Sequence, residues 1–169
     1  MNLYISAERN NTYFVDTINE YCTNSQGKHT AIFLPDIPAT PGETLSRRII
    51  RHLNSSDLIF MDLTPQEYKI EINANTFETR YFTNTGIVIE YSIAIILGRI
   101  EDMKIYCLIS PDNLHQVWRE RIVDPYPQGD KPAFLSYIDA IVTTRENDSL
   151  QVLRQSRVQA SFRSLYPEI

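Results

Sequence analysis

The chain has few of the side chains that build metal centres. Its two cysteines, Cys22 and Cys107, lie far apart, and neither has the spacing of a metal-ligand motif. Its three histidines, His29, His52 and His115, are scattered without paired ligand spacing, which favours surface histidines or hydrogen-bonded core histidines. We therefore expect a protein that holds no metal ion, and we expect no cofactor.

Positive charge is scarce as well. The 16 lysine and arginine residues are outnumbered by 21 aspartate and glutamate residues, so the formal net charge is -5 and the sequence pI is about 5.2. General binding to nucleic acids needs clustered lysine and arginine, and the acidic balance argues against this function class. The one basic cluster of note contains Arg47, Arg48, Arg51 and His52.

Long uninterrupted apolar runs are absent. The longest apolar stretch is broken by Glu90 and Ser92 and is far shorter than a membrane span requires. The start of the chain also lacks the basic region and apolar core of a secretory signal, because Glu8 and Arg9 interrupt it. We expect a cytoplasmic protein with no membrane partner.

What is present is the composition of an ordinary globular protein. Hydrophobic residues make up 43% of the 169 residues and charged residues 22%, which argues against wholesale disorder. A chain of this length can bury a substantial core without disulfides or metals. We expect one folded domain over residues 1–169.

Short runs rich in β-branched and aromatic residues alternate with longer amphipathic segments. The pattern predicts strands at Asn2–Ala7, Thr30–Leu34, Asp57–Leu63, Lys104–Ile109 and Tyr137–Val142. It predicts helices at Thr12–Ser25, Gly42–Asn54, Gly86–Ile100, Asn113–Ile122 and Glu146–Phe162. The alternation indicates an α/β fold, flavodoxin-like or Rossmann-like. We expect a three-layer sandwich around a five-stranded, mainly parallel sheet that binds ligands beyond the carboxyl ends of its strands.

Two connections are longer than usual. In the first, Thr64–Thr83, apolar residues alternate with charged neighbours as in an exposed strand or hairpin. In the second, Asp124–Ala133, three prolines force an irregular path. Each segment fits a lid over a site and fits a plain surface insertion equally well.

Glu90 is the most informative single residue. A polar turn at Asn84–Gly86 leads directly into a long apolar helix pattern that carries this one carboxylate in its first turns. A carboxylate in such a helix must be solvated through a pocket, paired or protonated. The competing interpretation is an acid held by the helix dipole and the free backbone amides of the first turn.

The predicted topology brings other polar residues toward Glu90. The first strand ends near Tyr4 and Ser6 and the third ends near Asp62, and parallel strands share one carboxyl edge. A carboxylate in a half-apolar pocket can attack an electron-poor sugar carbon or act as a base toward water. The pattern therefore indicates a site for chemistry at this edge.

Four segments together resemble a known family. LYISA, GETLSRRIIRHLNSSDLIFMDLT, NTGIVIEYSIAIILGR and KIYCLISP look like the nucleoside 2-deoxyribosyltransferase superfamily, including its small nucleotide N-hydrolase branch, over roughly residues 2–111. In that family, an aspartate-x-glycine-x-x-x-glutamate pattern opens the helix that carries the nucleophile. Here the pattern reads Asn84, Gly86 and Glu90.

The resemblance implies roles for individual residues. Glu90 would be the catalytic nucleophile, and Tyr4 in the first strand would position it. Asn84 would hold the nucleobase through its amide donor and acceptor. The expected substrate-binding residues are Asn84, Gly86, Asp62 and Ser6.

Two of these residues also have plainer interpretations. Asp62 can serve only to cap the turn at Thr64–Pro65, as aspartate often does before such turns. Ser6, whose hydroxyl at a strand end is placed to bind a phosphate, can equally be an ordinary solvent-facing serine.

The sequence departs from the family pattern at three positions. Asn84 replaces the base-contacting aspartate, and Tyr91 replaces the small residue that commonly follows the nucleophile. Ile49 stands where the family usually has a second acid, which removes a sugar-hydroxyl partner or proton relay. These changes leave open a diverged glycosidase and a nucleotide-binding module without turnover.

The leading expectation is cleavage or transfer at the N-glycosidic bond of a small nucleoside or nucleotide. The alternatives are a TIR-like hydrolase of nicotinamide dinucleotide (NAD) and a non-catalytic module that senses nucleotides or binds proteins. Small members of the resembled family complete their sites with a neighbouring subunit, which implies a homo-oligomer. Burial within one chain explains the same apolar residues.

Overall fold

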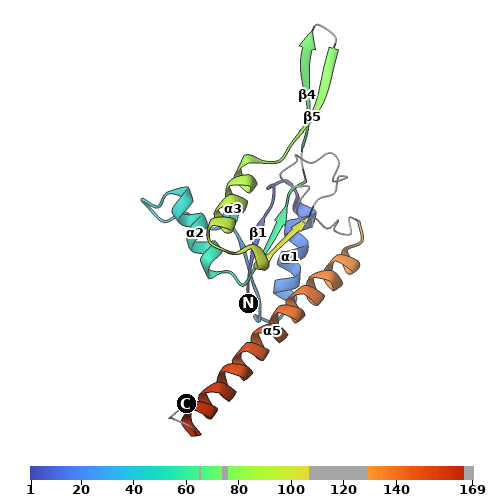
Figure 1. Ribbon diagram of the computed structural model, residues 1–169. Coiled ribbons are helices and arrows are strands. Elements are labelled where there is room, and N and C mark those ends of the chain that lie inside the picture. Colours follow the sequence, from blue (N-terminus) through green and yellow to red (C-terminus); the bar gives the residue numbers. More distant parts are fainter. Residues whose placement is uncertain (65, 74–75, 107–128, 166–169) are drawn as a thin grey trace.

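The computed structural model describes residues 1–64, 66–73, 76–106 and 129–165, and these form an α/β structure (Figure 1). Its main sheet has four parallel strands in the order β2-β1-β3-β6. The strands are β1 (Asn2–Ser6), β2 (Thr30–Phe33), β3 (Leu58–Asp62) and β6 (Met103–Tyr106). This arrangement is consistent with the expected flavodoxin-like or Rossmann-like fold.

Helices cover both faces of this sheet. Buried apolar side chains form two clusters, one on each face of the sheet. The first cluster lies between the sheet and two helices, α2 (Leu45–Ser55) and α3 (Thr85–Ile96). The second lies between the opposite face and two others, α1 (Thr12–Asn24) and α5 (Lys131–Leu165). Two short 3₁₀ turns, η1 (Leu34–Asp36) and η2 (Ile100–Asp102), complete the described elements.

The alternation of β1 assigns its side chains to the two layers. Leu3 and Ile5 pack with α1 and α5, whereas Tyr4 packs with α2 and α3. Because side chains alternate along a strand, Ser6 has the same orientation as Tyr4. β1 is flanked by β2 and β3, so Tyr4 and Ser6 lie in the middle of the sheet and at its carboxyl edge.

Local signals explain where the helices begin. The helix expected from Gly42 starts instead at Leu45, because Gly42 has a φ of 79° and Thr44 is the capping residue. The Thr44 side chain accepts a hydrogen bond from the Arg47 amide at 3.4 Å, which satisfies one of the free amides of the first turn. At the other expected boundary, α3 stops before Gly98, whose φ of 70° suits a glycine.

The strand expected at Tyr137–Val142 is wrong, because these residues belong to α5. The run is rich in apolar and β-branched residues, which suggested a strand. The buried residues of this part of α5 are Phe134, Ile138 and Val142. They are spaced four residues apart and therefore lie on one face of a helix. The helix expected at Glu146–Phe162 is the continuation of this same helix.

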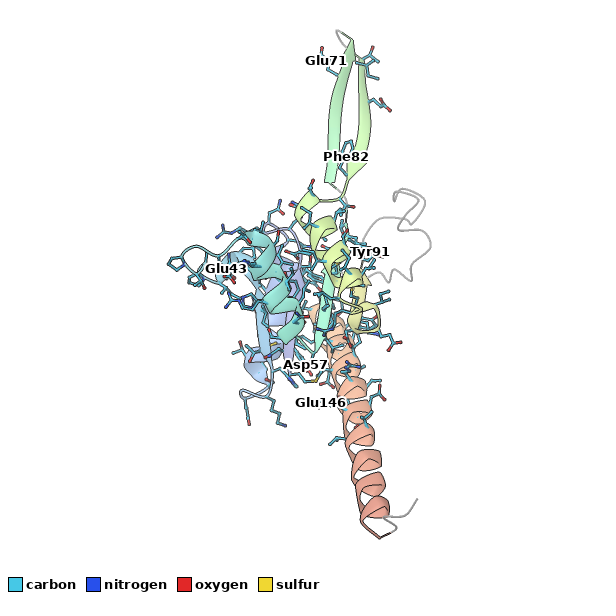
Figure 2. The ribbon with its side chains drawn as sticks, turned by 60° about the vertical axis from the view of Figure 1, so that its left-hand side comes forward. Glu43, Asp57, Glu71, Phe82, Tyr91 and Glu146 are labelled. Atoms are coloured by element: carbon cyan, nitrogen blue, oxygen red, sulfur yellow. The ribbon has the colours of Figure 1, made fainter. Side chains whose placement is uncertain are left out.

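Of the exposed strand or hairpin expected in Thr64–Thr83, the structure shows a hairpin. β4 (Gln66–Asn73) and β5 (Thr76–Phe82) pair antiparallel and contact each other far more than any other element. The hairpin projects from the body of the molecule (Figure 1), with Phe82 near its base and Glu71 near its far end (Figure 2). It is therefore an arm that leaves from the carboxyl side of the sheet.

Some expected elements lie outside the described residues. These are the helix at Asn113–Ile122, the end of the strand at Lys104–Ile109, and residues 124–128 of the proline-rich connection. The last residues of that connection, Lys131–Ala133, form the first turn of α5. No helix in the described ranges is both long enough and apolar enough to cross a membrane.

The first part of α5 is fastened to the body, and the rest extends beyond it (Figure 1). Phe134 packs against two aromatic rings of α1: it stacks on Tyr13, with ring centroids 6.1 Å apart, and lies tilted to Phe14, with ring centroids 5.7 Å apart. Tyr21 donates to the Asp139 carboxylate at 3.0 Å. Aromatic packing and burial at the start of α5 therefore hold this helix on the sheet.

Replacement of Phe134 tests this anchor. Phe134→Ala removes a fully buried ring and should lower the free energy of unfolding by about 3–5 kcal/mol. Leu150→Ala, in the exposed part of the same helix, should change it by less than about 0.5 kcal/mol. Urea denaturation of both variants measures the difference, and equal effects would contradict the anchor.

Candidate functional site

Glu90 lies on the inward side of α3. It follows Ile87 by three residues and precedes Ala94 by four, and both of these are buried. The helix is not buried all round, because Ile96 is 81% exposed. Although the sequence of α3 is almost uniformly apolar, only one side of the helix is buried. Glu90 is the acidic residue on that side.

Two hydroxyl groups of β1 lie beside the Glu90 carboxylate. Burial raises the pKa of Glu90 above its ordinary value because the charged form loses solvation, and the nearby hydroxyls of Ser6 and Tyr4 partly offset the rise. Burial raises the pKa of Tyr4, and the nearby Glu90 carboxylate raises it further, so the phenol keeps its proton and can act as a donor. The structure thus brings together three of the expected site residues.

The two hydroxyls are deeply buried and retain unused hydrogen-bonding capacity. Tyr4 is 0% exposed and Ser6 is 1% exposed, and neither hydroxyl oxygen has a hydrogen-bond partner among the described residues. They lie close enough to Glu90 to stabilise its charge, yet they do not reach it with the geometry of a full hydrogen bond. Buried polar atoms are nearly always satisfied, so these hydroxyls are placed to bind a water molecule, an ion or a ligand.

The alternative of a helix-dipole acid does not account for Glu90. The free backbone amides of a helix lie in its first turn. α3 begins at Thr85, so Glu90 comes after that turn. The interactions that lower the pKa of Glu90 come from Ser6 and Tyr4, on a different element. The carboxylate is thus held by the sheet rather than by the start of its own helix.

Asn84 and Gly86 form the turn that starts α3. The Asn84 side-chain oxygen accepts a hydrogen bond from the Gly86 amide at 2.7 Å and caps the helix. A β-carbon at Gly86 would lie 3.0 Å from that same oxygen, so the tight cap favours glycine. The amide nitrogen of Asn84 is exposed and makes no hydrogen bond within the described structure, so it keeps a donor for a base.

Asp62 is directed to the other layer. It follows the strand positions Leu58 and Phe60, whose side chains pack with α1 and α5. Its carboxylate accepts hydrogen bonds from the Thr64 amide at 3.0 Å and the Thr64 hydroxyl at 2.5 Å, and another from the Asn11 amide nitrogen. Burial raises the pKa of Asp62, and these three donors partly offset the rise.

The partners of Asp62 indicate a structural role. Asn11 is the capping residue of α1, where its oxygen accepts from the Phe14 amide at 3.3 Å. Asp62 therefore joins the end of β3 to the start of α1 and shapes the turn at Thr64. The structure does not bring Asp62 onto the face of the sheet that carries Glu90, which favours the plainer of the two interpretations for this residue.

Ile49 and Arg48 occupy neighbouring positions of α2 with different surroundings. Ile49 is buried in the apolar cluster with Tyr4, so the position of the family's second acid contributes packing here. Arg48 turns one guanidinium nitrogen to the backbone carbonyls of Leu34, at 2.6 Å, and Ile37. Its positive charge also acts on Tyr4, whose pKa it lowers slightly against the larger rise caused by burial.

Arg48 is the site residue that the sequence did not single out. It belongs to the basic cluster of residues 47–52, but nothing in that run distinguishes the arginine that faces the sheet from its exposed neighbours. The distinguishing signal is the period of α2. Ile49 and Leu53 mark the buried stripe, and Arg48 lies at its edge.

The two cavities found at the opposite edge of the sheet do not contain Glu90. One, of about 270 Å³, is lined by Leu58, Lys104 and Arg145 among others, and the other, of about 410 Å³, is lined by Tyr21, Lys28 and His29 among others. We place the candidate site at Glu90 because the buried hydroxyls of Tyr4 and Ser6 lie beside a carboxylate there and because parallel sheets bind ligands at their carboxyl edge.

No cluster of three His, Cys, Asp or Glu side chains in the described structure is arranged to hold a metal ion. The chain matches no model of a known protein family, and a search of curated proteins finds no significant match. Membership of the resembled superfamily is therefore not shown. The chemistry around Glu90 is the basis on which a function can be proposed.

The ionisation of Glu90 has a consequence for stability. Its pKa in the folded chain lies above the ordinary value of 4.5, so the folded state binds this proton more tightly than the unfolded state does. The folded chain is favoured by protonated Glu90 below about pH 4.5, and it loses that advantage as the pH rises through the raised pKa.

Glu90→Gln should therefore be more stable than the wild type at neutral pH, and the difference should shrink to near zero toward pH 4. Thermal unfolding of both proteins between pH 4 and pH 8 measures it. The matched control is Glu101→Gln at an exposed position, which should show no such trend. A variant that is less stable at neutral pH would contradict a desolvated Glu90.

Proposed function

We propose that the chain cleaves or transfers the N-glycosidic bond of a small nucleoside or nucleotide, with Glu90 as the nucleophile. The observation that supports this function is the half-buried Glu90 carboxylate beside the buried hydroxyls of Tyr4 and Ser6, which stabilise its charge but make no hydrogen bond of full geometry within the described residues. A carboxylate that has lost solvation is a stronger nucleophile and is well suited to an electron-poor sugar carbon. The same α/β layout binds ligands at this edge of the sheet.

The proposed reaction has two steps. In the first, a Glu90 oxygen forms a bond to the anomeric carbon as the carbon–nitrogen bond breaks, and the bonding electron pair leaves with the base. In the second, water attacks the glycosyl ester for hydrolysis, or a second base attacks it for transfer, and Glu90 is released as a carboxylate; the proton that the attacking group loses balances the proton that the departed base takes up. Asn84, at the start of α3, would donate a hydrogen bond to the departing base.

Tyr4 and Ser6 would control the charge on Glu90. Both hydroxyls favour its ionised form, whereas burial opposes it. A substrate sugar that enters the site would satisfy the hydroxyls and remove remaining water, so the carboxylate would be poised for attack. Because the pKa of Glu90 is raised, activity should rise with pH as the carboxylate forms.

The position of the hairpin favours a compact substrate over a dinucleotide. A dinucleotide such as NAD needs a groove that continues past the nucleophile, and the segment Thr64–Thr83 was a candidate for its wall. That segment is an arm that projects from the body and contacts little besides itself (Figure 1). A nucleoside or nucleoside monophosphate fits the compact group at Tyr4, Ser6 and Glu90.

A non-catalytic sensor is the second candidate, and one observation favours it. Ile49 is buried in apolar packing, so the position of the family's second acid supplies neither a proton nor a contact to a sugar hydroxyl. A sensor would use the same group to bind a nucleotide without breaking it. Turnover separates the two functions.

Glu90→Gln tests the nucleophile. The amide keeps the shape of the side chain but cannot form the glycosyl ester, so base release should fall on the order of 10³-fold or more while ligand binding survives. Chromatography of the released base measures the rate, with Glu101→Gln as the control that retains it. Turnover by Glu90→Gln at the wild-type rate would remove this residue from the mechanism.

A substrate panel tests the size of the site. Deoxynucleosides, deoxynucleoside monophosphates and NAD are incubated separately with the protein, and the released base is quantified by chromatography. We expect release from a nucleoside or monophosphate and none from NAD. Nicotinamide release alone would reverse this order, and stoichiometric binding without any release would establish the sensor.

A further inference from the structure

Arg48 approaches the same edge of the sheet from α2. The pairing of Ile5 with Phe33 sets Ser6 level with Leu34, whose carbonyl Arg48 holds. Tyr4, Leu34 and Ile49 share one apolar cluster, so the base of Arg48 lies on the layer that also contains Glu90. Glu90, on α3, Tyr4 and Ser6, on β1, and Arg48, on α2, thus come from three elements that meet on one face.

The hydrogen bonds of Arg48 do not use its buried Nε–H donor. A single terminal nitrogen serves both the Leu34 and Ile37 carbonyls. The Nε atom is buried and has no partner among the described residues, and no carboxylate of the described structure pairs with this guanidinium. Arginine is permanently charged, and its Nε–H can only donate.

An acceptor oxygen is therefore required to complete the site. Glu90 brings a carboxylate, and Tyr4 and Ser6 bring hydroxyls that can donate or accept, so these groups can satisfy one another or a sugar hydroxyl. The Arg48 Nε–H has no such choice, because it must meet an oxygen with a lone pair. A half-buried cation held only by neutral carbonyls also favours an oxygen that carries negative charge.

We propose that Arg48 is a substrate-binding residue whose Nε–H donates to an oxygen on the sugar side of the substrate, either a sugar hydroxyl or a phosphate attached to it. This inference rests on the proposed function for the identity of the substrate, and it assigns to Arg48 the contact that no acid at position 49 supplies. Arg48 would set affinity, whereas Glu90 would break the bond. The two carbonyl contacts hold the guanidinium in place before substrate binds.

The test uses two probes that lack a glycosidic bond, 2-deoxyribose and 2-deoxyribose 5-phosphate. Titrations followed by ligand-observed NMR give their affinities for the wild type, Arg48→Gln, Arg48→Lys and the control Arg47→Gln, which changes an exposed neighbour on the same helix. Loss of a hydrogen bond from a charged donor should weaken binding by about 10- to 100-fold in Arg48→Gln. Arg47→Gln should bind as the wild type does.

The two probes separate the two sources of the oxygen. A phosphate contact confines the loss to 2-deoxyribose 5-phosphate, and a hydroxyl contact produces the loss with both probes. Binding of both probes by Arg48→Gln at wild-type affinity would overturn the proposal, and so would a wild type that binds neither probe.

Arg48→Lys distinguishes substrate binding from a structural role. Lysine keeps the charge and a donor for the loop carbonyls but has no donor at the Nε position. We expect its unfolding temperature to stay near that of the wild type while its probe affinity falls. A well-folded Arg48→Lys that binds both probes like the wild type would contradict the Nε contact.

Steady-state kinetics test the role of Arg48 separately from the proposed glycosidase activity. With a substrate that is turned over, Arg48→Lys should raise KM by about tenfold and change kcat little, since the contact is made equally in the ground state. Base release with an unchanged KM would overturn the role of Arg48 and leave the glycosidase intact. Probe binding that depends on Arg48, without base release from any substrate, would overturn the glycosidase and leave this contact intact.

Discussion

The chemistry proposed for this chain depends on the partial loss of water around the Glu90 carboxylate. A carboxylate on an apolar helix is unfavourable unless other groups stabilise its charge, and the hydroxyls of Tyr4 and Ser6 stabilise it only in part. The fold tolerates this arrangement because β1 is central in the sheet and both layers of helices fasten it. Stability is given up locally at the point where chemistry is proposed.

The two layers contribute differently to that arrangement. The layer of α1 and α5 is closed by aromatic packing around Phe134 and by the contact of Asp62 with Asn11, so it supports the sheet. The layer of α2 and α3 presents the Tyr4 and Ser6 hydroxyls and the Arg48 Nε atom, which have no hydrogen-bond partner among the described residues. One face of β1 therefore holds the structure together, and the other face presents Tyr4 and Ser6 to Glu90.

Much of the fold follows from periodicity in the sequence. Four of the five expected strands follow from short apolar runs, the hairpin arm follows from an alternation with a period of two, and the helices at α1, α2 and α3 follow from a period near 3.6. The run at Tyr137–Val142 could not be assigned by its composition, because β-branched residues also fill a helix that packs on aromatic rings. Its spacing relative to Phe134 held the correct signal.

The site was predictable in its centre and not at its margins. Glu90 and Tyr4 were identified because an acid in an apolar helix is rare and because parallel strands end at one edge. Asp62 was expected there too, but the direction of a strand-end side chain depends on alternation that a shift of one residue reverses. Arg48 depends on the rotation of α2 against the sheet, which short motifs do not encode.

The most direct test of the central claim is the identity of the residue that becomes attached to the sugar. The protein is mixed with a deoxynucleoside monophosphate or other substrate that it turns over, quenched in acid within the first turnover, digested and analysed by peptide mass spectrometry. We expect a glycosyl adduct on Glu90 that forms as the base is released. Base release with an unmodified Glu90, or an adduct on another residue such as Asp62, would contradict it.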